Sequence, residues 1–323
     1  MKNGNEKKIL GIHHVTAIAG DPQRNIDFYT RILGLRLVKL TVNYDDPDTY
    51  HLYYGDKTGH PGTILTFFPW PGAPRGRRGT GQATVTSFLI PEDSVAYWLD
   101  RLKQNNVKFE EPARRFKNEE ECITFFDPDD LKLELIASSA AGNGKYTPWE
   151  KTPVPERNAI CGFHGITLSE EGYERTASLL KDTMGFRLVR EEGERFRYEA
   201  GEGGASTYVD LLCQPALPRG EVLAGTVHHV AWRTPDDDQQ KAWRREVVRA
   251  GLNPTPVIDR QYFHSVYFRE PGGVLFEIAT DPPGFAIDEP EDMLGTTLKL
   301  PPWLEPSRKH IEHALPKLQL TMV

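Results

Sequence analysis

The sequence predicts an α+β protein built from four copies of one module, in which a strand and a helix are followed by three more strands. Two observations lead to this prediction. Four segments repeat the same order of patterns, and each ends in an extended apolar run. Within each segment, one stretch has apolar residues at helical spacing, and the stretches around it have the composition of strands. One helix followed by three strands differs from the alternation of a parallel βαβ array.

Module one begins with the strand candidate "GIHHVTAIAG" and continues into a helix within "DPQRNIDFYTRILG". Asp21 can cap this helix, and Pro22 suits its first turn. Ile26, Tyr29 and Leu33 recur at helical spacing and predict its buried face. The strand candidates "RLVKLTV", "TYHLYYGD" and "GTILTFFPW" complete the module.

The other three modules follow the same order. Module two has the strand "ATVTSFLIP", a helix in "EDSVAYWLDRLKQNN" and the closing strand "LKLELIA". The buried stripe predicted for that helix is Val95, Trp98, Leu99 and Leu102. Module three has "GFHGITL", a helix in "SEEGYERTASLLKDTMGF" and the closing strand "TYVDLLCQ". Module four runs from "GTVHHVAWRT" through "DDQQKAWRREVVRAG" to "SVYFREPGG" and "VLFEIATD".

Composition shifts divide the chain into two domains. Residues 138–158 are rich in Gly, Pro, Ser and Lys and are typical of a linker. We therefore expect one pair of modules at 9–137 and a second pair at 159–288, with a C-terminal tail at 289–323. In this tail, Pro306 can start a short helix that packs back on the body.

The overall composition excludes several classes of function. The formal net charge is -7, which gives no positive footprint for nucleic acid. There is no run of 18 apolar residues and no apolar signal core near the N-terminus, so we expect a cytoplasmic protein without a membrane segment. Cys122, Cys161 and Cys213 are odd in number and far apart, which predicts buried reduced thiols. A homo-oligomer is compatible with these features.

Paired histidines stand at the same position of modules one and four. "IHHVT" aligns with "VHHVA", so His13 corresponds to His228 and His14 to His229. Neighbouring side chains of a strand point to opposite faces, so two adjacent histidines cannot both face one site from a regular strand. We expect one histidine of each pair to bind a metal, while its neighbour, on the other face or at a distorted strand end, supports it or moves a proton.

The closing strands add one carboxylate to this pattern. Glu277 lies in mid-strand in "VLFEIAT", and a buried carboxylate is costly unless it is paired or bound to a metal. Two histidines and one carboxylate from separate strands form a facial triad with open coordination positions, most typically for non-haem Fe(II) that handles O2. The predicted metal ligands are His14, His229 and Glu277.

Other candidates compete with this triad. His164 in "GFHGIT" reaches the ligand position if the alignment shifts by one residue, although the aligned residue is Gly165. Glu134 and Asp210 align with Glu277 but have no histidine partners, and we expect them to face solvent or to be hydrogen-bonded. The remaining histidines of the modules are expected to be structural: His51, His60 and His264.

"GIHHVT", "VHHVAW" and "FEIATDPPGF" resemble the vicinal oxygen chelate superfamily, which includes glyoxalase I, drug-sequestering resistance proteins and extradiol dioxygenases. Nearly the whole chain, including "YHLYYGDKTGHPGTILTFFP" and "LPPWLEPSRKHIEHALP", is similar to the hydroquinone ring-cleaving dioxygenases. This resemblance implies a fold of βαβββ modules with a metal cup between modules one and four. It also implies Fe(II), a small aromatic substrate and O2. Mn(II) is the alternative, because Fe(II) and Mn(II) prefer similar ligand sets.

The resemblance further implies a set of residues around the metal ligands: His13, Thr16, His228, Arg260 and Tyr267. Tyr267 is then a donor to the substrate oxygen, and His228 or His13 is a base for the incoming phenol. Arg260 holds an anionic oxygen or forms a structural salt bridge. Tyr53, the repeat partner of Tyr267, and Phe67 either line the cup or belong to the core.

Two other functions stay open at this point. A glyoxalase-like isomerase or lyase would use the metal as a Lewis acid and take a fourth ligand from the closing strand of module one, where this chain has Thr66. A resistance protein would sequester a flat aromatic ligand without chemistry, and that class usually lacks the triad. Metal content separates the binding protein from both enzymes.

Overall fold

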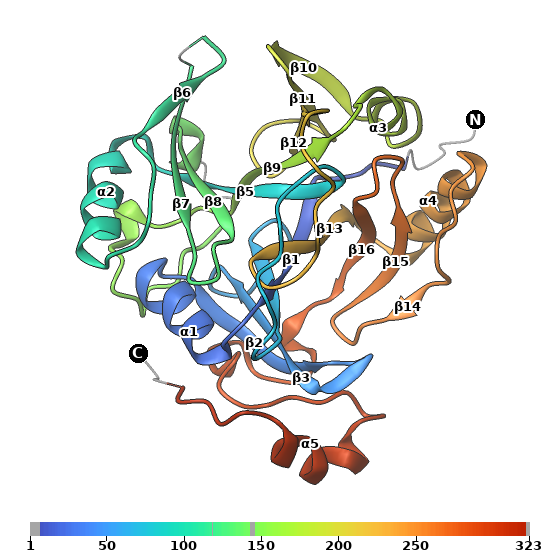
Figure 1. The fold of residues 1–323 in the computed structure, drawn as a ribbon. Coiled ribbons are helices and arrows are strands. Elements are labelled where there is room, and N and C mark those ends of the chain that lie inside the picture. Colours follow the sequence, from blue (N-terminus) through green and yellow to red (C-terminus); the bar gives the residue numbers. More distant parts are fainter. Residues whose placement is uncertain (1–6, 118, 143–145, 321–323) are drawn as a thin grey trace.

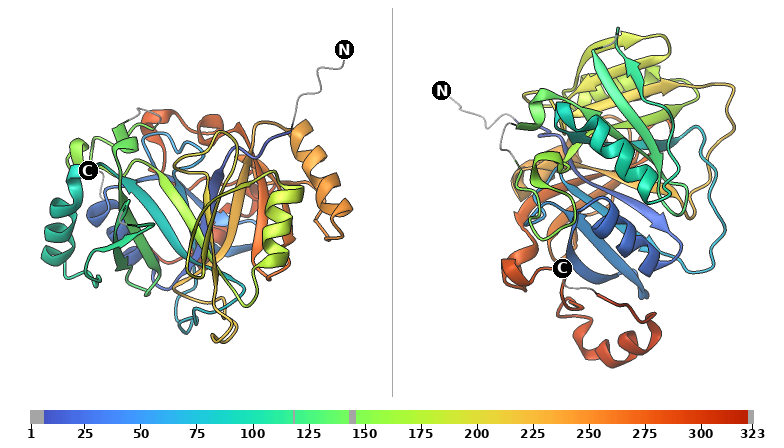
Figure 2. Two further views of the ribbon diagram at one scale, coloured as in Figure 1. Left: turned by 90° about the horizontal axis from the view of Figure 1, so that it is seen from above. Right: turned by 90° about the vertical axis from the view of Figure 1, so that its left-hand side faces the viewer.

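Two curled eight-stranded sheets form the body of the protein (Figure 1). The computed structural model describes residues 7–117, 119–142 and 146–320. All four modules have the predicted order of one strand, one helix and three strands, which confirms the α+β fold of βαβββ modules. The helices lie on the outside of the sheets (Figures 1 and 2).

Each sheet joins two modules. In spatial order, the first sheet contains β14 (Ile258–Asp259), β15 (Phe263–Arg269), β16 (Leu275–Pro283), β13 (Thr226–Thr234), β1 (Ile12–Ala19), β4 (Ile64–Pro69), β3 (Asp46–Gly55) and β2 (Arg36–Asn43). The second sheet contains β10 (Arg187–Glu192), β11 (Arg195–Glu199), β12 (Tyr208–Cys213), β9 (Phe163–Glu170), β5 (Gln82–Ile90), β8 (Lys132–Ala137), β7 (Glu120–Phe126) and β6 (Ala113–Arg115).

The sheets pair modules that are not neighbours along the chain. β1 of module one pairs antiparallel with β13 of module four, and β5 of module two pairs with β9 of module three. Figure 1 shows the blue strand β1 beside the orange strand β13, although they come from opposite ends of the sequence. Each sheet therefore contains one module from before residues 138–158 and one from after them. The predicted domain boundaries stay a prediction.

The helices follow the predicted cap and most of the predicted faces, with two differences. Asp21 caps the first helix by accepting a hydrogen bond from the backbone N–H of Arg24 at 2.8 Å. In the second helix Trp98 and Leu102 are buried, whereas Val95 and Leu99 are partly exposed. The third helix begins at Glu174 and not at Ser169, because Ser169 continues β9 and pairs with β5 and β12.

The helical segments have the following bounds. The α-helices are α1 (Pro22–Asp27), α2 (Val95–Gln104), α3 (Glu174–Ser178), α4 (Asp237–Arg249) and α5 (Arg308–Ala314). α1 and α3 continue as single π-turns, η1 (Phe28–Ile32) and η5 (Leu179–Thr183). The short 3-10 helices are η2 (Glu92–Ser94), η3 (Ser139–Gly142), η4 (Glu156–Asn158), η6 (Phe285–Ile287), η7 (Glu291–Met293) and η8 (Glu305–Ser307). In the part of the chain that the structure describes, none of these helices has the length and apolarity to cross a membrane.

The C-terminal tail packs against module one, as predicted (Figure 2). Pro306 lies in η8, directly before α5, and Ile311 of α5 is buried. The Tyr50 hydroxyl on β3 donates a hydrogen bond to the Pro316 carbonyl at 2.9 Å. The tail therefore adds a layer over the strands of module one.

The three cysteines are free, but only one has the expected environment. Cys122 is buried, whereas Cys161 and Cys213 are partly exposed. Burial raises the pKa of the Cys161 thiol to about 11, which keeps this sulfur protonated at neutral pH. The expectation of three buried thiols was therefore wrong for Cys161 and Cys213.

A buried ion pair fastens the start of the tail to the first sheet. The Lys39 ammonium on β2 has no exposed area and lies 2.7 Å from Asp288 and 2.6 Å from Glu289. We expect Lys39→Ala to lower the free energy of unfolding by about 3–5 kcal/mol, because it leaves two carboxylates without their cation. Chemical denaturation measures this change. Arg308→Ala, which removes exposed pairs with Glu305 and Glu312, is the control and should cost less than about 1 kcal/mol.

Glu170 makes stability depend on pH. Its side chain is fully buried, and neither carboxylate oxygen has a hydrogen-bond partner among the described residues. Burial, and then the Glu270 carboxylate, raise the pKa of Glu170 to about 8. Between the ordinary value of 4.5 and about 8, the folded chain keeps a proton that the unfolded chain releases, so stability falls as pH rises through this window.

Glu170→Gln should remove this dependence, because the amide does not titrate. We expect a difference of at most about 1.4 kcal/mol per pH unit between the wild-type and variant slopes, measured by denaturation from pH 5 to pH 8.5. The exposed neighbour variant Glu171→Gln should behave like the wild type. A wild-type slope that persists in Glu170→Gln would contradict this account.

Candidate metal centre

Two β-bulges place the histidine pairs. The register between β1 and β13 shifts twice, and the extra residue is His13 on β1 and His228 on β13. In each case the residues on both sides pair with consecutive residues of the partner strand. A bulge re-aims side chains and breaks the regular alternation of faces. Each pair of adjacent histidines can therefore approach one centre, which the pleat of a regular strand forbids.

The three predicted ligands lie together in the first sheet. The Nε2 atoms of His14 and His229 are 3.3 Å apart. Glu277 Oε2 lies 3.2 Å from His14 Nε2 and 3.0 Å from His229 Nε2. Glu277 comes from β16, which pairs with β13. The set is buried, and one donor atom of each residue lies within 4.8 Å of the others.

The donor atoms fit a divalent metal. Donors about 2.1 Å from a metal at neighbouring octahedral corners are about 3 Å apart, and all three separations here are close to this value. Glu277 Oε2 is buried without a hydrogen-bond partner among the described residues. Burial opposes ionisation of Glu277, but His14 and His229 outweigh it and hold the pKa of this carboxyl well below its usual value. A bound cation would satisfy the free oxygen.

Each of the three predicted ligands contacts a neighbouring side chain that orients it. His13 Nδ1 lies 2.9 Å from His14 Nδ1, and His13 Nε2 lies 3.1 Å from the Thr280 carbonyl. His228 Nδ1 lies 2.7 Å from His229 Nδ1. The Ser265 hydroxyl donates to the other oxygen of Glu277. Such contacts fix the orientation of metal ligands and raise their basicity.

Burial favours the neutral form of three imidazoles around the centre, those of His13, His228 and His229. Burial lowers the pKa of His13 well below its ordinary value, and it lowers that of His228 to about 3. Burial also lowers the pKa of His229, against the opposing pull of Glu277. Neutral imidazole is the form that binds metals, so the site needs no prior loss of a proton from these histidines.

A cavity of about 420 Å³ opens beside the triad. Arg260 and Tyr267, which the sequence placed near the ligands, both line it, and so does Tyr53. Phe67 instead belongs to the hydrophobic core. The Arg260 guanidinium donates to Asp45 at 2.9 Å and lies 5.4 Å from the centre of the Tyr267 ring. The structural salt bridge expected for Arg260 is therefore present, and its side chain also borders the cavity.

Sequence reasoning missed part of the cavity wall. His51, expected to be structural, lines the cavity between the rings of Tyr53 and Phe68, whose centres are 4.0 and 4.2 Å from its own. In "TYHLYYGD", His51 and Tyr53 stand two residues apart, so a strand presents them on one face. That spacing could have identified His51. Thr16 does not line the cavity; it is fully buried and lies 2.8 Å from Thr66, oxygen to oxygen.

The second sheet holds no such triad among its described residues. His164 is itself a bulged residue of β9, so Gly165 keeps the position that corresponds to His14. His164 Nε2 lies 3.4 Å from a Glu120 oxygen. His60 and His264 pair with Asp56 and Asp237, which agrees with the structural role expected for them.

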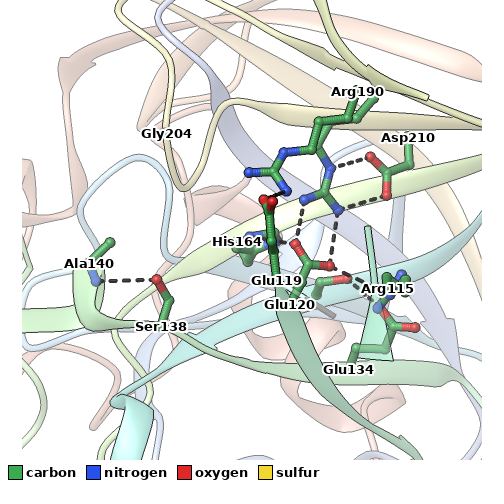
Figure 3. Close-up of polar contacts among 12 residues, drawn as sticks. Arg115, Glu119, Glu120, Glu134, Ser138, Ala140, His164, Arg190, Gly204 and Asp210 are labelled. Atoms are coloured by element: carbon green, nitrogen blue, oxygen red, sulfur yellow. Dashed lines mark hydrogen bonds and ion pairs between the residues drawn. The ribbon is translucent and has the colours of Figure 1, made fainter. Parts of the chain in front are cut away.

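In the second sheet, arginines pair with the carboxylates of the closing strands (Figure 3). Glu134 accepts hydrogen bonds from Ser87 at 2.8 Å and Arg115 at 2.6 Å. Asp210 is bonded by two more guanidinium groups, those of Arg195 and Arg197. Of the two expectations for Glu134 and Asp210, hydrogen bonding is the one that the structure shows.

Comparison with known proteins identifies the family. The family described as the Glyoxalase/Bleomycin resistance protein/Dioxygenase superfamily matches this chain over residues 11–135 and 162–278, which is more than half of its length. The chain belongs to this superfamily. A solved structure from Bacillus subtilis has a TM-score of 0.91 at 47% identity and covers 98% of this chain and 100% of that one. Glyoxalase I from Zea mays shares the fold at 17% identity, with a TM-score of 0.61 and coverage of 84% and 92%.

Two curated members of the superfamily are similar over almost their full length. "Putative ring-cleaving dioxygenase MhqO" of Bacillus subtilis (strain 168) is 48% identical over 309 residues, which is 96% of each chain. Chlorohydroquinone/hydroquinone 1,2-dioxygenase of Sphingobium indicum is 35% identical over 307 residues, which is 93% of this chain and 94% of that protein.

Metal retention tests the centre directly. We expect His14→Ala to lose metal affinity by at least about tenfold, because it removes one of three donors, whereas His164→Ala should keep the metal of the wild type. Elemental analysis after dialysis measures the metal per chain. Both variants replace a buried histidine at a bulge, so His164→Ala controls for damage to the strand. Loss only in His164→Ala would move the metal to the second sheet.

Proposed function

We propose that this protein is an Fe(II)-dependent dioxygenase that opens the ring of para-dihydroxy aromatic compounds with O2. The observation that carries the proposal is a buried triad, with donor atoms 3.0–3.3 Å apart, beside a cavity with aromatic walls. The names of the relatives at 48% and 35% identity support ring cleavage as the reaction class and hydroquinone as the substrate class.

His14, His229 and Glu277 would hold the metal. Two imidazoles and one carboxylate suit Fe(II) and Mn(II), and we favour Fe(II) because this set with open positions is typical of non-haem Fe(II) oxygenases. When bound, the metal supplies neighbouring positions for a substrate oxygen and for O2, so that the ring and its oxidant meet.

The cavity would bind and orient the ring. Its volume of about 420 Å³ lies in the ordinary range of small-molecule sites. Tyr53, Phe68 and Tyr267 offer aromatic faces, and a flat substrate packs favourably against such rings. Arg260 supplies a positive charge near the rim that attracts an ionised hydroxyl.

Tyr267 and His228 would donate hydrogen bonds to the substrate. Burial, followed by the nearby Glu277 carboxylate, raises the pKa of Tyr267, so its hydroxyl keeps its proton. If His229 Nε2 faces the metal, its Nδ1–H donates to His228 Nδ1, and His228 then carries its hydrogen on Nε2. The His228 ring lines the cavity, where this N–H can meet an oxygen atom.

Thr66 weighs against the glyoxalase-like alternative. It occupies the position on β4 that corresponds to Glu277 on β16, and its hydroxyl already contacts Thr16 and His51 at 2.8 Å each. A hydroxyl held in this way does not replace the fourth carboxylate of a glyoxalase centre. The position that a fourth ligand would fill stays available to substrate and O2.

Oxygen uptake tests the proposed reaction. After anaerobic loading with Fe(II), we expect the protein to consume O2 with hydroquinone and not with a methylglyoxal–thiol adduct. O2 uptake with catechol tests whether the reaction needs hydroxyl groups in the para arrangement. O2 uptake by the Mn(II)-loaded protein tests which metal supports the reaction. Glu277→Gln should lose at least about a hundredfold in rate, because it replaces the anionic carboxylate ligand by a neutral amide. Isomerisation of the adduct without O2 would replace this proposal with the glyoxalase reaction.

A further inference from the structure

A chain of hydrogen bonds begins at the part of the cavity wall that module one supplies. The Tyr53 hydroxyl lies 2.9 Å from His51 Nδ1, and His51 Nε2 lies 2.8 Å from the Thr66 hydroxyl oxygen. Thr66 in turn lies 2.8 Å from the Thr16 hydroxyl oxygen. Tyr53 and His51 line the cavity, whereas Thr66 and Thr16 are fully buried. The chain therefore begins at the cavity and ends inside the sheet.

Module four has a different arrangement at the corresponding positions. Tyr53 pairs with Thr66 across β3 and β4, as Tyr267 pairs with Glu277 across β15 and β16. Two residues before each tyrosine stand His51 and Ser265, and Ser265 is bonded to Glu277. Both sides of the cup thus present a tyrosine. At these positions, module one hydrogen-bonds its tyrosine to an imidazole, whereas module four has a serine bonded to Glu277.

The other histidines of the cup are held by their contacts. The Thr280 carbonyl accepts a hydrogen bond from His13 Nε2, so the lone pair of His13 is on Nδ1, where it faces His14 Nδ1. The same geometry turns the Nδ1 lone pair of His228 to His229. Both lone pairs are used to orient the imidazoles of the triad. His51 is the described histidine of the cavity whose hydrogen-bond contacts are both with hydroxyl groups.

Resting on the proposed function, we propose that Tyr53 and His51 form the pair that takes the proton of an incoming phenolic substrate. The substrate O–H bond breaks and its proton passes to the Tyr53 oxygen, while the Tyr53 proton passes to His51 Nδ1. The substrate oxygen becomes a phenolate, and His51 becomes an imidazolium that returns the proton when the product leaves. Tyr53 touches the substrate, and His51 acts through it.

The surroundings of His51 keep its imidazole neutral at rest, and the same low pKa opposes a lasting imidazolium and favours return of the proton. Burial, and then His14 and His229, lower the pKa of His51 well below its ordinary value, so the resting imidazole is neutral and has a lone pair. Arg260 also lowers this pKa and Glu277 opposes the shift, and the titratable Tyr53 hydroxyl lies 2.9 Å from His51 Nδ1. With Nε2–H directed at Thr66, and Thr66 directed at Thr16, Nδ1 is left to accept from Tyr53.

A binding experiment without O2 tests this inference independently of the reaction. Metal-loaded protein is titrated anaerobically with 4-nitrophenol, whose phenolate form absorbs at longer wavelength, and the pH at which half of the bound probe is ionised is recorded. We expect this midpoint to rise by about one unit or more in His51→Gln and in Tyr53→Phe. His60→Gln, which changes a histidine of the same module outside the cavity, is the control and should match the wild type.

An unchanged midpoint in His51→Gln or Tyr53→Phe would overturn the inference. Tyr53→Phe removes only one oxygen, so it serves if His51→Gln does not fold. Because the probe needs no O2, a chain that shows these shifts but consumes no O2 with hydroquinone would refute the proposed reaction and keep the proton-accepting pair.

The pH profile of O2 uptake separates proton transfer from a structural role. At neutral pH, His51→Gln should lower the rate by about 10²–10⁴-fold, the usual range for general acid–base groups, with unchanged metal content. The loss should shrink as pH rises, and with chlorinated hydroquinones, because these substrates reach the site already ionised. An equal loss at every pH and with every substrate would contradict proton transfer and leave only a structural role.

Discussion

The antiparallel pairing of β1 with β13 is the constraint on which the site depends. It brings the first and last modules into one sheet and sets their histidine pairs opposite each other. The two bulges in this pairing then turn both members of each pair toward the same centre. A regular ladder with the same residues would direct His13 and His228 away from it. The candidate metal centre is thus a consequence of strand register as much as of residue type.

Both sheets bury carboxylates in their closing strands and differ in how they neutralise them. In the first sheet Glu277 faces two imidazoles and keeps one oxygen free of hydrogen bonds. In the second sheet guanidinium groups occupy the space around Glu134 and Asp210. In either case the groups around the carboxylate offset the cost of burying its charge. One architecture therefore contains a reactive centre and, in its other half, a structural ion-pair network.

Modules one and four contribute different residues to the candidate metal centre and its cavity. Module four contributes two of the three donors and the serine that holds Glu277. Module one contributes the third donor, and at the position of the missing carboxylate it has Thr66, bonded to His51. This difference would leave a bound metal open on one side. It also places the phenol and imidazole groups of Tyr53 and His51 beside the opening.

The sequence by itself determined the four βαβββ modules and the three residues His14, His229 and Glu277, because repeats, helical spacing and a carboxylate inside an apolar strand are local patterns. The sequence did not predict the start of the third helix, because pairing with neighbouring strands decides it. It also did not predict the exposure of Cys161, because the packing of loops decides it. Only the tertiary structure decided which modules share a sheet, and that His51 lines the cavity. Register across strands and contacts between distant segments leave no periodic trace in a single sequence, because they arise only when separate parts of the chain are packed together.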